Sequence, residues 1–301
     1  MPTQYGNFHD FCRDTGSLRS TLPVCNLFSE SQSRGGNGFG GCDLVGFSVG
    51  GSRRLANLGS IIIDGIAIAL SLFLIWRSNR KRAAVGRREM QLFLLGFTII
   101  SFCEIFTIGG FTLDGAVRRG FSAVHIAAIV ATTWILLMNG AVGYQFLDDG
   151  TFASLALIFG SAVILFVGTG YIALDTGFSW TGYWDDTLIA PNRSYSLYTL
   201  YQLVPLVFLS IFFILEAVIV VRVLGEIRPM FYLVAAMLLF AIGQIFQYVI
   251  SVHLCNATNG AINGGLFESL FTLLAVVMIW VFWSSITEDD WPLPSTETTY
   301  T

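Results

Sequence analysis

Charged residues are scarce in this sequence. Only 12% of its 301 residues are Asp, Glu, Lys or Arg, 54% are hydrophobic, and the mean hydropathy is +0.68. A soluble domain carries about 25% charged residues to cover its surface, so most of the surface of this chain must face lipid. Because the net charge is −4 and bases are few, we expect no binding to nucleic acid.

Lysine and histidine are almost missing as well. The single lysine, Lys81, lies outside the apolar runs, which excludes a retinal protein because its Schiff base needs a lysine inside a span. The three histidines, at positions 9, 125 and 253, stand on separate segments, and no C-x-x-C spacing or phosphate-binding loop occurs. The Gly-rich stretch Gly36–Gly41 lacks the strand–helix context of a dinucleotide fingerprint. We therefore predict no catalytic residues, no cofactor and no metal site, and that the chain is not an enzyme.

Seven apolar runs are long enough to cross a bilayer as helices, which takes about 20 residues each. They are continuous rather than alternating, which excludes a membrane β-barrel. The predicted fold is all-α: a polytopic membrane protein with a seven-transmembrane-helix bundle at 57–283, a cysteine-containing cap at 1–56 and an acidic tail at 284–301. The predicted spans are 57–76, 90–112, 121–146, 152–174, 197–222, 230–252 and 262–283.

Basic residues between the first two spans predict the orientation, because short loops rich in Lys and Arg stay in the cytosol. Seven spans then place the N-terminal cap in the lumen and the C-terminal tail in the cytosol. Arg53 and Arg54 oppose this orientation but are outnumbered. The bases of the predicted cytosolic loop are Arg77, Arg80, Lys81, Arg82, Arg87 and Arg88.

Sequons and cysteines agree with this orientation. Asn192 and Asn256 each begin an N-x-Ser/Thr sequon in a loop assigned to the lumen, where glycosylation occurs, although such sequons also arise by chance. Four lumenal cysteines predict up to two disulfides with three possible pairings, and buried free thiols are the alternative. The cysteines assigned to the lumen are Cys12, Cys25, Cys42 and Cys255.

Five ionisable side chains lie at membrane depth, where such groups are costly and often functional. One interpretation is a polar centre that binds a ligand or relays protons. The other, which we favour because no cation matches their depth, is hydrogen bonding between helices that fixes their packing. These candidates for intramembrane polar contacts are Asp64, Glu104, His125, Glu216 and Glu268.

Short polar motifs flank the spans in a fixed order. They are Phe8–Cys12 (FHDFC), Leu22–Cys25 (LPVC), Ala84–Glu89 (AVGRRE), Asp148–Thr151 (DDGT), Phe267–Ser269 (FES) and Thr287–Asp290 (TEDD). This series on seven spans resembles the fungal chitin synthase export chaperones over nearly the whole chain. The resemblance implies a protein of the endoplasmic reticulum membrane that helps a chitin synthase to fold and to leave in transport vesicles, and so supports chitin deposition in the cell wall.

The partner that the resemblance implies is a chitin synthase, bound stoichiometrically within the lipid bilayer and sometimes accompanied to the plasma membrane. Glu288, Asp289 and Asp290 in the acidic tail are candidates for contact with vesicle-coat machinery or basic client loops; the alternative is a tail that only stays solvated. The alternative function is a seven-helix cell-surface receptor. Against it, the predicted cytosolic loops are short, and the Asp/Glu-Arg-Tyr and Asn-Pro-x-x-Tyr sequences of rhodopsin-like receptors do not occur.

Overall fold

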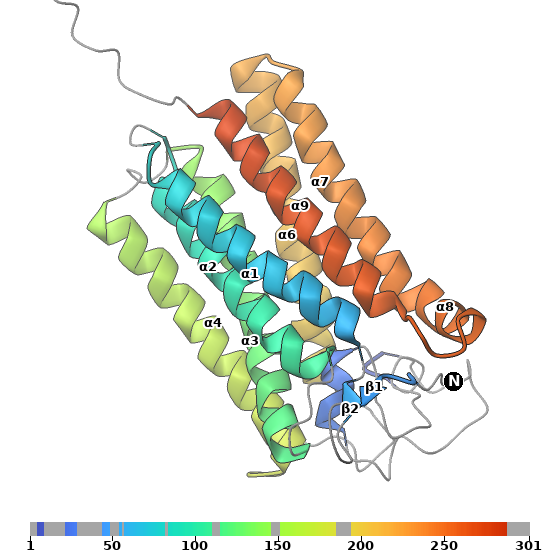
Figure 1. The fold of residues 1–301 in the computed structure, drawn as a ribbon. Coiled ribbons are helices and arrows are strands. Elements are labelled where there is room, and N and C mark those ends of the chain that lie inside the picture. The colour runs from blue at the N-terminus through green and yellow to red at the C-terminus, as the bar shows by residue number, and fades with distance from the viewer. Residues whose placement is uncertain are drawn as a thin grey trace, which may run out of the picture.

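The computed structural model describes residues 5–8, 22–28, 44–48, 54–55, 57–81, 84–109, 115–145, 151–184 and 194–287. These residues form a bundle of seven long apolar helices (Figure 1), which confirms the all-α seven-span fold. The spans are α1 (Leu58–Ser78), α2 (Arg87–Thr107), α3 (Gly115–Val142), α4 (Phe152–Phe178), a fifth at Tyr195–Leu224, a sixth at Arg228–Ala257, and α9 (Gly264–Ile286).

The fifth and sixth spans contain π-helical turns, which hydropathy does not reveal. Such turns are rare and often lie at functional sites. The fifth span consists of α5 (Tyr195–Tyr198), the π turn η3 (Thr199–Leu203), α6 (Val204–Val218) and the π turn η4 (Ile219–Leu224). The sixth consists of α7 (Arg228–Ile245), the π turn η5 (Phe246–Ile250) and α8 (Ser251–Ala257).

Local capping decides where the helices begin and end. Asn57 accepts a hydrogen bond from the Ser60 backbone N–H at 3.2 Å and so caps α1, an arrangement that satisfies a free donor of the first turn. The second span differs from its prediction: α2 ends at Thr107 rather than at residue 112. Glu104 therefore lies in the last turn of α2 and not in the middle of a span.

The two ends of the bundle are called here the N-side, where α1 begins, and the C-side, where α1 ends. On the N-side, the short 3-10 helix η1 (Pro23–Leu27) packs against α3 and α4, and its Val24 is fully buried. Nearby, β1 (Phe47–Ser48) and β2 (Arg54–Leu55) form a short antiparallel ladder. The division of the chain into a cap, a bundle and a tail stays a prediction, and residues 288–301 lie outside the described part.

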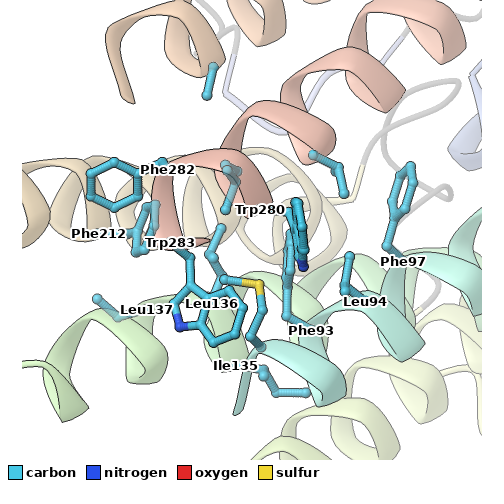
Figure 2. Close-up of a cluster of buried hydrophobic side chains, with 14 of the residues drawn as sticks. Phe93, Leu94, Phe97, Ile135, Leu136, Leu137, Phe212, Trp280, Phe282 and Trp283 are labelled. Carbon is cyan, nitrogen blue, oxygen red and sulfur yellow. The ribbon is translucent and has the colours of Figure 1, made fainter. Parts of the chain in front are cut away.

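The helix α3 lies at the centre of the bundle. Of its apolar window, 67% is buried, against 22% for α4, and it packs against α2, α4 and α6. A second group of contacts joins α7 to α9, and α1 connects this pair to the rest. Toward the C-side, α2, α3, α6 and α9 meet in an aromatic core in which Trp280 and Trp283 are buried (Figure 2).

The loop between α1 and α2 is held at the C-side by side chains from distant parts of the chain. Trp283 Nε1 donates to the Val85 carbonyl at 2.9 Å, and Asn139 Nδ2 donates to the Gly86 carbonyl at 3.1 Å. Lys81 Nζ donates to the Ser284 carbonyl at 2.9 Å, in the last turn of α9, where a cation suits the helix dipole. The motif Ala84–Glu89 thus forms part of a joint between four helices.

We expect Gly264→Ala to destabilise the protein, because α9 begins in close contact with the sixth span. An added Cβ would collide with the Phe246 carbonyl and lie 2.7 Å from Ser251 Cβ. Overpacking of this kind costs about 1–3 kcal/mol. The free energy of unfolding, measured by SDS titration in mixed micelles, should fall accordingly.

The matched control for this variant is Gly160→Ala in α4. There an added Cβ meets nothing within 4 Å, and Ala is the better helix former by about 0.5–1 kcal/mol. This variant should therefore be as stable as the parent or slightly more so. Equal losses in the two variants would contradict the close packing of α9 on the sixth span.

Candidate functional site: a polar cavity inside the bundle

Four of the five predicted intramembrane residues come together near the N-side. Asp64 of α1 lies beside Glu104 of α2 and Glu268 of α9. His125 of α3 places its Nε2 3.4 Å from Glu104 Oε1. Asp64, Glu104 and His125 are exposed by only 1%, 7% and 2%. Four helices therefore contribute one ionisable side chain each to a single cluster.

Glu216 does not belong to this cluster. It is buried near the C-side end of α6, where Gly140 of α3 allows the two helices to approach closely. The neighbouring Tyr144 donates from its hydroxyl to the Leu215 carbonyl at 2.8 Å. Burial and the nearby Glu216 carboxyl raise the pKa of Tyr144. The predicted set of five residues is thus two sites, one of four residues and one of a single carboxyl.

The cluster of four borders a cavity of about 310 Å³, a volume at the lower end of the range for small-molecule sites. Glu104, His125 and Glu268 line it directly, whereas Asp64 lies behind Glu104. Most other lining side chains are apolar, and they come from α2, α3, α6, α7 and α9. The cavity is therefore polar on its N-side part and apolar along its walls.

Uncharged polar residues complete the polar part, and a search for ionisable groups missed them. The Tyr248 hydroxyl of η5 donates to Gln202 Oε1 of η3 at 2.9 Å, so that two π turns are joined across the cavity. Thr272 Oγ1 donates to Glu268 Oε1 at 3.1 Å. The available signal in the sequence was glutamine and tyrosine within otherwise apolar runs. The uncharged polar residues that line the cavity are Thr132, Thr133, Tyr201, Gln202, Gln244, Gln247, Tyr248 and Thr272.

The N-terminal segment covers the N-side of the cavity. Leu22 and Pro23 are themselves lining residues, and Asn26 of η1 anchors the segment by donating from Nδ2 to Ser122 Oγ at 3.0 Å. Both partners in this hydrogen bond are buried. Phe8, from the motif Phe8–Cys12, is buried in the same apolar cluster as Val24. Two of the motifs that flank the first span therefore contribute to the cover over the cavity.

The structure describes some of the predicted cysteines and glycosylation sequons. Cys25 and Cys255 are disulfide-bonded, and Cys103 is a buried free thiol. Cys12 and Cys42 lie outside the described residues, so the pairing stays a prediction. Asn256 is exposed beyond the cavity, and its glycosylation stays a prediction. Asn192 and the tail residues Glu288, Asp289 and Asp290 also lie outside the described part.

One short stretch of the sequence matches the spacing of a catalytic motif. Residues Gly46–Gly50 read G-F-S-V-G, the G-x-S-x-G pattern of a nucleophile elbow, which requires a sharp strand-to-helix turn. Ser48 instead ends β1, is exposed, and pairs with Arg54 of the antiparallel strand β2, the next element along the chain. This serine therefore belongs to a strand pair and not to an elbow.

The cluster is built for hydrogen bonding. Within the described ranges, no three or more His, Cys, Asp and Glu side chains are arranged to hold a metal ion. Some buried atoms of the cluster make no hydrogen bond with another described group. They are Nδ1 and Nε2 of His125, Oε2 of Glu268 and Oδ2 of Asp64. Because His125 and Glu268 line the cavity, their atoms can form hydrogen bonds with a group that enters it.

Comparison with known proteins identifies the family. The model of the family described as "Chitin synthase export chaperone" matches residues 4–297. This chain belongs to the chitin synthase export chaperone family. A protein of that name from Coccidioides immitis is 28% identical over 294 residues, covering 95% of this chain and 83% of the relative. One from Aspergillus clavatus is 27% identical over 297 residues, covering 95% and 84%.

These relatives confirm the resemblance that the ordered motifs indicated. A third, from Chaetomium globosum, bears the same name and is 28% identical over 247 residues, covering 79% of this chain and 73% of the relative. All three are named as chaperones, which gives no support to the receptor alternative. No solved structure matches the chain significantly. The arrangement of the cavity therefore comes from the structure of this chain alone.

We expect the Glu104 and His125 side chains to stabilise the bundle jointly. In a double-mutant cycle with Glu104→Gln and His125→Ala, neighbouring groups couple by about 0.5–3 kcal/mol. The free energies of unfolding of the parent, the two single variants and the double variant, each from SDS titration, give this coupling.

The control cycle replaces His125→Ala by Glu216→Gln, a buried carboxyl outside the cluster. Glu104→Gln and Glu216→Gln should be additive to within about 0.5 kcal/mol, because distant sites act independently. Equal coupling in both cycles would show that the polar cluster is not a local unit.

Proposed function

We propose that this protein helps a chitin synthase to fold and to leave the endoplasmic reticulum by binding it stoichiometrically inside the membrane. The observation that carries the proposal is the family match over residues 4–297, which includes all seven spans. In this role the protein supports chitin deposition in the cell wall and catalyses no reaction itself.

The positions of the family-like motifs support a binding role. Leu22–Cys25 forms part of η1, which covers the cavity, and the motif at Ala84–Glu89 supplies backbone acceptors to Asn139 and Trp283. In both places the motif holds parts of the fold together, and neither place brings a nucleophile to a base. Such motifs suit a scaffold that must keep its shape while its partner is incomplete.

The outer faces of the bundle support association within the bilayer. Ile164 of α4, Ile214 of α6 and Phe231 of α7 are exposed by 74%, 63% and 69%, and they have many apolar neighbours on these faces. Helices associate in lipid through close packing and interhelical hydrogen bonds rather than through the hydrophobic effect. We infer that helices of the client bind to these faces and displace the lipid there.

We infer that the N-side faces the lumen of the endoplasmic reticulum. Disulfides persist in oxidising compartments, which suits Cys25 and Cys255 on the N-side. Arg77 at the end of α1 and Arg87 and Arg88 at the start of α2 lie at the C-side, which suits the cytosol. Asn192 and Asn256 are then candidate glycosylation sites, and the same topology allows the protein to accompany its client to the plasma membrane.

Loss of the protein should keep its client in the endoplasmic reticulum. In cells that lack it, at least one fluorescently tagged chitin synthase should remain in the endoplasmic reticulum, while a secreted control protein leaves normally. The two proteins should also co-purify from mild detergent in the wild type, because the proposed association is stoichiometric. Normal delivery of every chitin synthase in the deletion strain, or no co-purification, would overturn the proposal.

The acidic tail gives a separate prediction. If Glu288, Asp289 and Asp290 contact vesicle-coat machinery or basic client loops, truncation after Thr287 should slow client exit without lowering the amount of chaperone. The triple variant Glu288→Lys, Asp289→Lys and Asp290→Lys reverses the charge and should slow client exit as strongly as the truncation does. Client exit at the wild-type rate in both variants would assign the tail to solvation alone.

A further inference from the structure

The cavity has an unbalanced set of charges. Three carboxyl groups, those of Asp64, Glu104 and Glu268, face one histidine, His125. No Lys or Arg is among the described residues that line the cavity. A carboxylate at membrane depth is costly unless a cation pairs with it. A cation that enters the cavity would therefore favour the ionised form of the carboxyl group that it contacts.

The cavity also has a long apolar part. Glu104 and Phe93 both line it from α2, and at 1.5 Å per residue they lie about 16 Å apart along the helix. Glu268 and Ile279 on α9 have the same spacing. The polar residues thus occupy one end, and the apolar walls continue toward the C-side. This shape matches a molecule with a small polar head and one narrow tail.

The wall of the cavity that α6 provides is partly exposed. Leu206 of α6 lines the cavity and is 56% exposed on the outer face. The helix α6 packs mainly on α3, and α7 packs mainly on α9, so the two walls belong to different groups of contacts. We expect a ligand from the lipid to enter on this side.

We propose that the cavity binds an amphipathic primary amine, with its ammonium group between Glu104 and Glu268 and its alkyl chain along the apolar walls. An ammonium group has three donors and no acceptor, and its hydrogen bonds to carboxylates are charge-assisted and short. The rings of Tyr201 and Tyr248 also line the polar end, where an aromatic face attracts a cation. The single charge of the ligand would pair with one ionised carboxyl group of the cluster.

The test uses the full-length protein in phosphatidylcholine nanodiscs, with binding followed by native mass spectrometry. The probes share one chain length and differ only in the head: dodecylamine, 1-dodecanol and lauric acid. We expect one saturable dodecylamine per chain, bound at least tenfold more tightly than lauric acid or 1-dodecanol. Equal binding of the three probes, or no saturable binding of dodecylamine, would overturn the proposal.

Variants separate the site from the surrounding lipid. Glu104→Gln and Glu268→Gln keep the side-chain shape and should each weaken dodecylamine binding at least tenfold. Ala275→Leu, which fills the apolar wall, should also weaken it. Glu216→Gln removes a buried carboxyl outside the cavity and should leave binding unchanged. A thermal unfolding midpoint for each variant identifies any that fails to fold, and unchanged affinity in the folded glutamine variants refutes the assignment.

This inference is independent of the proposed chaperone role. The binding assay contains no chitin synthase, so a negative result leaves the client proposal intact. Conversely, a deletion strain with normal chitin synthase export would not affect the measured affinity for dodecylamine.

Discussion

Water is absent at membrane depth, so every buried polar side chain in this bundle depends on other protein groups for its hydrogen bonds. This constraint determines how the helices face one another. Asp64, Glu104 and Glu268 sit on three different helices, and a carboxyl turned toward lipid would be costly on any of them. Their meeting near the N-side therefore fixes the rotation of α1, α2 and α9 about their own axes.

The cover on the N-side follows from the same constraint. The polar cluster lies within a few turns of the helix ends, where an open mouth would admit water and headgroups. The segment at η1 covers that end with apolar side chains, and Asn26 and Ser122, which are buried there, satisfy each other with a hydrogen bond. Cys25, which is disulfide-bonded, lies in the same segment.

Hydropathy predicted the spans because crossing a bilayer is a local property of chain length and composition. It placed Glu104 too deep, because apolar residues such as Ile108 continue after α2 has ended at Thr107. Position along the spans already places Glu216 toward the opposite end of the bundle from Asp64 and Glu268. Which side chains meet could not be predicted, because the direction in which each residue points depends on helix rotation and neighbours. Gln202 and Tyr248 were missed for a different reason: they carry no charge, and the π turns that bring them together have no signature in hydropathy.

The two ends of the bundle are built in opposite ways, and the difference bears on what each can do. At the C-side, Trp280 and Trp283 pack in a dense aromatic core (Figure 2). Their indole N–H groups donate to the Ser78 hydroxyl and the Val85 carbonyl. Dense cores resist any change of shape, because adding or removing even one methylene group disturbs the packing. This end can hold the helices in register.

Toward the N-side, the polar residues surround space instead of filling it. Several polar atoms of the cluster, including both ring nitrogens of His125, make no hydrogen bond to another described residue. A buried polar group without a hydrogen-bond partner costs free energy. The bundle therefore combines a densely packed half with a half that contains a polar cavity. The cavity lies between the two groups of helices, because α6 packs mainly on α3 and α7 packs mainly on α9.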